Sequence, residues 1–155
     1  MTPESRPDTP DTPDTPDTPA TSSGAASSQR LLLLAHGSRR QEWARPFEAV
    51  LDSLRELRPA VDMRLCFLEA MPPLLPQALD SAAQDGCAEV ILVPLFLGTG
   101  AHLRDDVGRE VLAAQARNPG LRVSVAAAAG DSALVSRALA GYALQCLDRG
   151  GDHAV

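Results

Sequence analysis

Short apolar runs alternate four times along this chain with longer stretches in which apolar residues recur every three or four positions. The runs are residues 30–35, 63–68, 89–94 and 122–126. The first contains four consecutive leucines at 31–34 and has no polar face. Runs of this length predict strands, and the absence of a polar face predicts burial on both sides of a parallel sheet.

The longer stretches predict helices. The first helix is expected from Pro46 to about residue 57, because proline is favoured at the first helical position. Residues 36–45 then form a loop of about ten residues, and loops of that length at strand ends are usually functional. A second helix is expected to begin at Pro72 and Pro73 and to end at Gly86.

Two further helices complete the pattern. One is expected from about residue 104 or 105 to 118, after a loop at 95–103, and Pro119 ends it. Asp131 is expected to cap the last helix. The apolar face of that helix consists of Val135, Leu139, Tyr142 and Cys146.

This alternation predicts βαβ units and therefore an α/β domain with a parallel sheet. The expected architecture is a doubly wound four-stranded sheet of order 2-1-3-4. In that order the first and third strands lie side by side, at the switch point where ligands bind beyond the carboxyl ends of the strands.

Residues 1–29 are predicted to be a disordered tail, because Pro-Asp-Thr repeats offer nothing that could form a core. The α/β domain then spans residues 30–149, and residues 150–155, including His153, are expected to fray. The net charge is −6, and the acidic tail carries most of it. The near-neutral domain gives no electrostatic reason to expect nucleic acid as a partner.

Three cysteines without a CxxC pair predict buried, reduced thiols and a cytoplasmic protein. They are Cys66, Cys87 and Cys146. Apolar runs are much shorter than the roughly 18 residues of a membrane span, so no membrane association is expected.

Three chemically active side chains follow three of the predicted strands. His36 follows the first strand, Glu69 the second, and His102 lies in the predicted loop after the third. The topology brings all three to one edge of the sheet. Two imidazoles and a carboxylate suit Co²⁺, Fe²⁺ or Ni²⁺, and they could equally accept protons.

Cations and glycines occupy the same predicted edge. Arg39, Arg40 and Arg104 would suit an anionic ligand. Asp106 lies one helical turn beyond His102 and could orient its ring. Gly98 and Gly100 do not form a dinucleotide-binding fingerprint, because Leu103 occupies the third glycine position. They would instead permit a tight turn or the close approach of a flat ligand.

Three motifs in order carry a family resemblance: His36-Gly-Ser-Arg39, Phe67-Leu-Glu69-Ala-Met-Pro72, and Pro94-Leu-Phe-Leu97-Gly-Thr-Gly100-Ala-His102 followed by Asp106. Together they resemble the small CbiX-type sirohydrochlorin chelatases, half-size relatives of the two-domain class II cobaltochelatases and ferrochelatases. The resemblance covers about residues 30–149.

The resemblance implies a metal chelatase, a lyase that inserts cobalt or iron into sirohydrochlorin during cobalamin or siroheme biosynthesis. It implies that His36 and His102 hold the metal while Glu69 assists, with no cofactor beyond the substrate metal. The arginines would bind the carboxylates of the tetrapyrrole, and the half-size chain would form a homodimer. The alternative is a non-catalytic carrier that binds the metal or the tetrapyrrole without turnover.

Overall fold

The computed structural model describes residues 29–98 and 100–149, apart from the side chains of residues 101 and 102. The predicted tail lies outside the described residues except for Gln29, which belongs to the first strand. The predicted frayed end at residues 150–155, with His153, also lies outside them.

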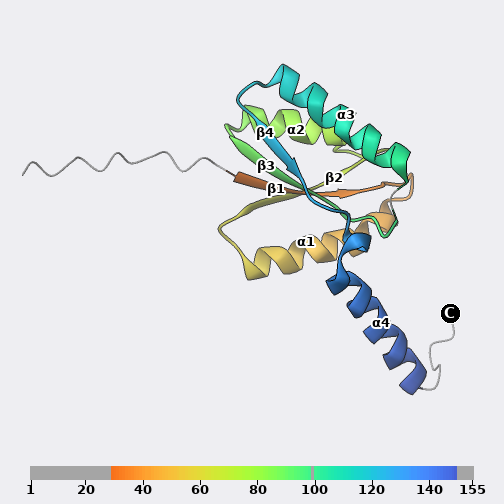
Figure 1. The fold of residues 1–155 in the computed structure, drawn as a ribbon. Helices are drawn as coiled ribbons and strands as arrows, with labels where there is room; N and C mark the ends of the chain where they lie inside the picture. Colours follow the sequence, from red (N-terminus) through yellow and green to blue (C-terminus); the bar gives the residue numbers. More distant parts are fainter. Residues whose placement is uncertain (1–28, 99, 150–155) are drawn as a thin grey trace, which may run out of the picture.

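Four parallel strands form the sheet in the described part of the chain (Figure 1). They are β1 (Gln29–Ala35), β2 (Asp62–Phe67), β3 (Glu89–Pro94) and β4 (Arg122–Val125). Their order is β2-β1-β3-β4, which confirms the predicted topology. The strand of consecutive leucines occupies an inner position, where a run without a polar face can bury both of its sides.

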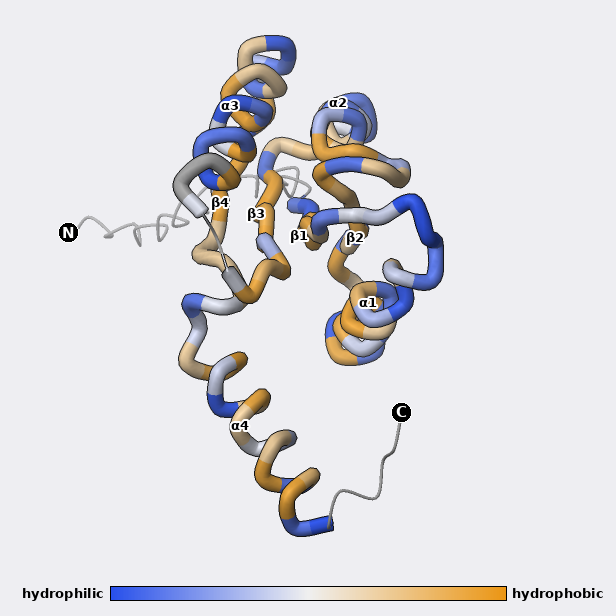
Figure 2. The backbone as a smooth tube through the Cα atoms, turned by 90° about the vertical axis from the view of Figure 1, so that its right-hand side faces the viewer, coloured by the Kyte–Doolittle hydropathy of each residue, from blue (hydrophilic) through white to orange (hydrophobic). Residues whose placement is uncertain are grey.

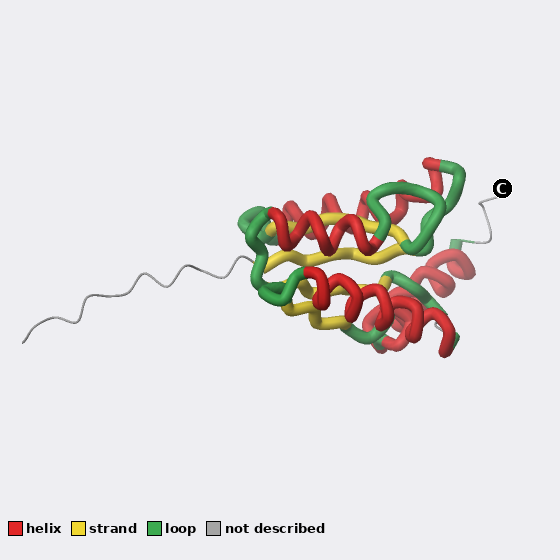
Figure 3. Tube along the Cα trace, turned by 90° about the horizontal axis from the view of Figure 1, so that it is seen from above, coloured by secondary structure: helices red, strands yellow, loops and turns green. Residues whose placement is uncertain are grey.

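Helices cover both faces of the sheet (Figures 2 and 3). On one face, α2 (Leu75–Gln84) and α3 (Ala101–Arg117) pack over the alternate leucines Leu32 and Leu34. On the other face, α1 (Arg45–Leu57) packs over Leu33 and the half-buried Leu31. One leucine-rich strand thus supplies side chains to both layers of the core.

The starts of the first two helices differ in part from the prediction. Pro46 lies in the first turn of α1 as expected, but the short 3₁₀ helix η1 (Gln41–Ala44) replaces the second half of the predicted loop. Its last residue, Ala44, is buried beside Phe67. The helix α2 begins at Leu75, later than expected, because the carbonyl of Pro73 accepts a hydrogen bond from the Phe67 amide at 2.9 Å and so extends the chain along β2.

The start of α3 is a correction to the prediction. The helix begins at Ala101, with Gly100 in extended conformation as its N-cap, rather than near Arg104. The amide of Arg104 donates to the carbonyl of Gly100 at 3.4 Å, within the first turn. His102 therefore lies at the start of a helix and not in a loop.

The last helix, α4 (Ala133–Asp148), forms as predicted, although its cap and its packing differ from the prediction. Ser132 is the N-cap, and its hydroxyl accepts a hydrogen bond from the Leu134 amide at 3.3 Å. Asp131 instead ends the short 3₁₀ helix η2 (Ala129–Asp131). The expected apolar face packs on no core, because no α4 residue is buried in the described structure. Figure 2 shows α4 running away from the sheet.

The amino-terminal edge of the sheet, where the strands begin, holds a buried arginine. Arg30 is 1% exposed, and its guanidinium donates to Asp62 at 2.7 Å and to Asp85 at 2.8 Å. Two carboxylates thus compensate the buried positive charge. No helix in the described part of the chain is long and apolar enough to cross a membrane.

Candidate functional site at the carboxyl edge of the sheet

His36 directly follows β1, and its exposed ring lies against the ring of Phe96. The ring centroids are 4.4 Å apart, and the planes are tilted by 44°. Phe96 follows β3 and is itself 3% exposed. An aromatic ring fixed in the core therefore supports one side of the imidazole, at the point where β1 and β3 adjoin. The sequence interpretation included Phe96 in a family motif but gave it no role in the site, although its position after the neighbouring strand was a usable signal.

Backbone hydrogen bonds bring Glu69 next to His36. The amide of Leu68 donates to the carbonyl of Ala35 at 3.0 Å, and the amide of Glu69 donates to the carbonyl of His36 at 3.1 Å. The pairing of β1 with β2 thus continues beyond the ends of both strands. Both side chains are exposed at this edge. The structure brings together these two of the predicted site residues.

Gly37 is required where these two segments approach. Its φ is +90°, a conformation that side chains rarely adopt, and a Cβ atom there would overlap the carbonyl of Glu69. Glycine avoids both problems because it has no Cβ atom. The His-Gly pair in the sequence therefore reflects the close contact between two loops.

The segment after Glu69 turns tightly and returns to β2. Ala70 has a φ of +65°, and the amide of Met71 donates to the carbonyl of Glu69 at 2.8 Å. Met71 is buried and anchors the turn in the core. Glu69 is thus held by main-chain bonds and by a neighbouring apolar anchor, while its carboxylate is exposed.

His102 is the second residue of α3, and its side chain lies outside the described structure. The predicted grouping of its imidazole with His36 and Glu69 thus lies outside the described residues. Among the described side chains, no three His, Cys, Asp or Glu residues form a metal-binding group.

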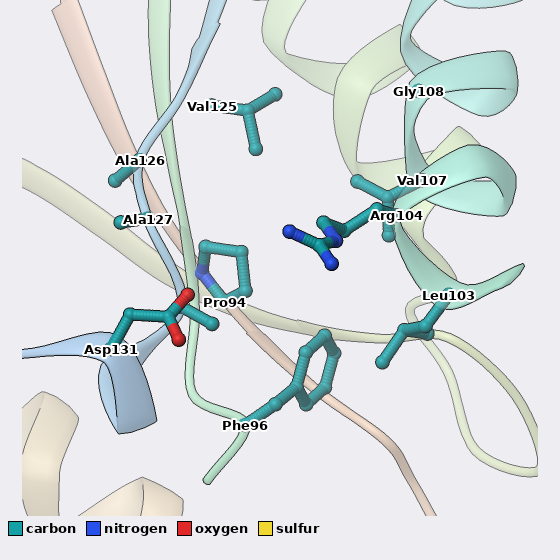
Figure 4. Close-up of a pocket in the computed structure, with 11 residues that line it drawn as sticks. Pro94, Phe96, Leu103, Arg104, Val107, Gly108, Val125, Ala126, Ala127 and Asp131 are labelled. Carbon is teal, nitrogen blue, oxygen red and sulfur yellow. The ribbon is translucent and has the colours of Figure 1, made fainter. Parts of the chain in front are cut away.

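A cavity of about 370 Å³ lies beside this edge, between β4 and the start of α3 (Figure 4). Its wall is largely apolar and includes Pro94, Phe96 and Val107. Arg104 and Asp131 both line it, from different elements. Of the three predicted binding arginines, Arg104 thus lies at a cavity. The sequence interpretation had treated Asp131 only as a helix cap.

Arg39 and Arg40 are exposed in the segment that follows His36. The amide of Arg40 donates to the hydroxyl of Ser38 at 3.2 Å, and the guanidinium of Arg40 takes no part in this bond. Gly98 and Gly100 are exposed, and a Cβ atom on either would meet open space. No contact within the described structure requires glycine at these two positions.

Asp106 is exposed and forms an ion pair with Arg109, at 2.6 Å between Oδ1 and Nη2. The two residues are three positions apart on α3, a spacing that brings side chains together on a helix. This pair occupies one oxygen of the carboxylate, and the predicted contact of Asp106 to His102 lies outside the described residues.

The fold and the arrangement of its loops define a chelatase-like α/β half domain, as solved structures show. A CbiX protein from Marinobacter aquaeolei VT8 superposes with a TM-score of 0.69 and 26% identity, over 79% of this chain and 99% of that one. The sirohydrochlorin chelatase SirB from Bacillus subtilis subspecies spizizenii, in complex with cobalt, gives a TM-score of 0.66 and 26% identity. That match covers 76% of this chain and 50% of SirB.

The chain belongs to the CbiX family, whose model matches residues 30–143. Similar curated proteins include the sirohydrochlorin ferrochelatase of Priestia megaterium, 29% identical over 60% of this chain. The sirohydrochlorin cobaltochelatase of Methanocaldococcus jannaschii is 32% identical over 52% of this chain. The chain spans 35% of the length of the first relative and 57% of the second.

Proposed function

We propose that this protein is a sirohydrochlorin chelatase that inserts a divalent metal, Co²⁺ or Fe²⁺, into a carboxylate-rich tetrapyrrole. Membership of the CbiX family supports this activity, as do relatives named for cobalt and for iron. The main structural support for the proposal is the adjacency of His36 and Glu69. A backbone hydrogen bond of 3.1 Å joins these two residues at the carboxyl edge of the sheet.

In this proposal His36 and His102 hold the substrate metal, with Glu69 as an assisting ligand or proton acceptor. Insertion requires the metal to lose water and two pyrrole nitrogens to lose their protons. A neutral imidazole suits all three metals considered, including Ni²⁺. Glu69 is exposed beside His36, so its carboxylate can accept a pyrrole proton without reorganising the loop. No cofactor beyond the substrate metal is needed for this chemistry.

The arginines and glycines would bind the macrocycle. Arg39, Arg40 and Arg104 can pair bidentately with its carboxylates, since a guanidinium presents parallel N–H donors. The open surroundings of Gly98 and Gly100 would let a flat ring approach the backbone. Asp106 would orient His102 by accepting a hydrogen bond from its imidazole, since the ion pair with Arg109 occupies only the Oδ1 atom of Asp106.

We further propose that the protein works as a homodimer in the cytoplasm, acting on a soluble tetrapyrrole rather than on a membrane or a nucleic acid. The match to half of the SirB chain supports a second unit that completes the site. Three free cysteines, two of them buried, support a reducing compartment.

Anaerobic metal insertion is the decisive experiment. Purified protein, sirohydrochlorin and Co²⁺, Fe²⁺ or Ni²⁺ in separate reactions would be followed by the change in tetrapyrrole absorbance. A chelatase gives many turnovers per protein above the spontaneous rate. A carrier gives at most a stoichiometric change, and that result would replace the proposed enzyme with the alternative binding protein.

A further inference from the structure

The exposed imidazole of His36 needs a contact that holds its ring at a fixed angle if it is to bind a metal. An exposed side chain otherwise changes rotamer within nanoseconds, whereas a metal site needs ligands whose rotamers are locked by their surroundings. A hydrogen bond to the second ring nitrogen is the usual orienting device. The structure shows a contact of another kind for His36. The ring of Phe96 lies against the imidazole, with centroids 4.4 Å apart and planes tilted by 44°.

Phe96 itself is fixed in the core. It is 3% exposed and belongs to a cluster of buried side chains that includes Leu34 of β1 and Leu92 of β3. Protein cores are close-packed, so a buried phenyl ring has little room to change its rotamer. The imidazole of His36 thus rests against a surface that is more rigid than the loop in which His36 lies.

The main chain around Phe96 is also held from two sides. The amide of Leu95 donates a hydrogen bond to the carbonyl of Leu34 at 2.8 Å, and the amide of Gly130 donates to the carbonyl of Phe96 at 2.8 Å. These bonds tie the segment after β3 to β1 on one side and to η2 on the other. The backbone and the side chain of Phe96 are therefore both fixed by the fold.

The glycine in η2 permits this close approach. A Cβ atom on Gly130 would overlap the carbonyl group of Leu97, the residue that follows Phe96. Glycine has no Cβ atom and so allows two main chains to come into direct contact. The attachment of η2 to the segment that carries Phe96 thus depends on the identity of this one residue.

We propose that Phe96 is a positioning residue for His36, whose ring holds the imidazole in the orientation that binds the substrate metal. The inference rests on the proposed function, because it takes His36 as a metal ligand. The centroid distance is at the short end of the range for aromatic pairs, so the two rings are in direct contact. Such a contact orients the imidazole without a hydrogen bond to either nitrogen. A ligand that is already oriented loses less conformational freedom when the metal binds, and this raises the affinity.

The contact can be measured by NMR without a metal. The phenyl ring shifts the resonances of protons that lie against it, so the Cδ2 and Cε1 protons of His36 should differ from those of a histidine in an unfolded peptide. We expect this difference to shrink in Phe96→Leu and to persist in Phe96→Tyr. The resonances are assigned by their loss in His36→Ala. Unchanged His36 shifts in Phe96→Leu would show that the rings are not in contact and would overturn the inference.

The affinity for Co²⁺ alone, measured anaerobically by calorimetry without a tetrapyrrole, tests the role of the contact. We expect Phe96→Leu to weaken Co²⁺ binding about 10- to 100-fold, the usual effect of removing a residue that orients a metal-binding histidine. Phe96→Tyr should bind nearly as tightly as the wild type. It keeps the ring, and the cavity that this ring lines has room for the added hydroxyl group (Figure 4).

Phe47→Leu is the matched control. It also removes a phenyl ring, from a half-buried side chain on α1 that packs on a different cluster. Urea denaturation of each variant reports the loss of stability separately from the loss of affinity. If Phe96→Leu does not fold, Phe96→Met takes its place, because the flexible methionine side chain adapts to irregular gaps in a core.

A purely structural Phe96 would lower the stability of Phe96→Leu and leave the Co²⁺ affinity of the folded protein unchanged, which would overturn the inference. Equal losses of affinity in Phe96→Leu and Phe47→Leu, or in Phe96→Leu and Phe96→Tyr, would also contradict it. The inference fails as well if His36→Ala binds Co²⁺ as tightly as the wild type. Metal insertion is measured on the same samples. A protein that binds Co²⁺ through His36 but inserts none would refute the proposed activity and leave the positioning role of Phe96 intact.

Discussion

The amide of Glu69 donates a hydrogen bond to the carbonyl of His36 at 3.1 Å, so two side chains 33 positions apart in the sequence are fixed next to each other by main-chain atoms alone. Because neither side chain takes part in this bond, either can be replaced without removing the link. Mutations at these positions therefore test chemistry more than folding.

Replacing His36 or His102 with alanine should lower metal insertion at least about 100-fold, a typical effect for a catalytic side chain. The measurement is the initial rate of metallation under anaerobic conditions, with circular dichroism to confirm the fold. His153→Ala is the matched control, since it is the remaining histidine of the chain. Near-wild-type rates in both variants would show that the histidines do not hold the metal.

Gly37→Ala should destabilise the protein by about 1–3 kcal/mol, the usual range for a non-glycine residue forced into such a conformation. The added methyl group would meet the carbonyl of Glu69, where φ is +90°. Urea denaturation measures the effect, and Gly120→Ala is the control because a Cβ atom there meets open space. Equal stability of the two variants would refute the requirement for glycine.

The hydrogen bond from Arg30 lowers the pKa of Asp85, and this makes the stability of the fold depend on pH. A lowered folded-state pKa stabilises the protein above the ordinary aspartate pKa of about 3.9, and the contribution is lost as pH falls through the lower folded value. Asp85→Asn should lower the melting temperature at pH 7 and flatten the acid limb of its pH profile between roughly 5 and 3.

Thermal denaturation from pH 7 to 3 would check this, with Asp52→Asn as the comparison. Asp52 is exposed and contacts Arg55 at 3.4 Å on the same helix, a pairing of little expected effect. An acid limb in Asp85→Asn as steep as in the wild type would show that Asp85 is not responsible.

Burial raises the pKa of Cys66 to about 12. The neutral thiol is therefore the form present at pH 8, and it is a poor nucleophile. We expect maleimide to leave Cys66 unmodified in the folded protein and to modify it in urea, as measured by peptide mass spectrometry. Rapid labelling of Cys66 without denaturant would mean that this strand opens readily.

The strands were predictable because burial on both sides demands apolar runs, and β1 to β4 follow those runs to within about a residue. The starts of helices were less predictable. Gly100 acts as the N-cap of α3, but its proximity to Gly98 favoured a loop instead. Pro46 correctly predicted the start of α1, but nothing in the sequence pattern predicted the 3₁₀ turn that precedes this helix.

The candidate site also has a part that the sequence predicted and a part that it did not. Topology alone placed His36 and Glu69 at one edge, because the carboxyl ends of parallel strands coincide. The contact between His36 and Phe96 depends on how side chains pack, which the pattern of residue types does not encode. The position of α4 was not predicted either. Its apolar face indicates burial, but the pattern of residue types does not specify which surface packs against it.

The two ends of β1 separate the protein's stability from its chemistry. Arg30 lies buried at one end with its carboxylate partners, and His36 is exposed just past the other. Six residues of extended chain rise about 20 Å, roughly twice the Debye length in physiological salt. Substitutions that strengthen or weaken the Arg30 cluster should therefore change the melting temperature and leave the rate of the proposed metal insertion unchanged. The amino-terminal edge of the sheet is thus the place to stabilise the fold without changing any residue of the candidate site.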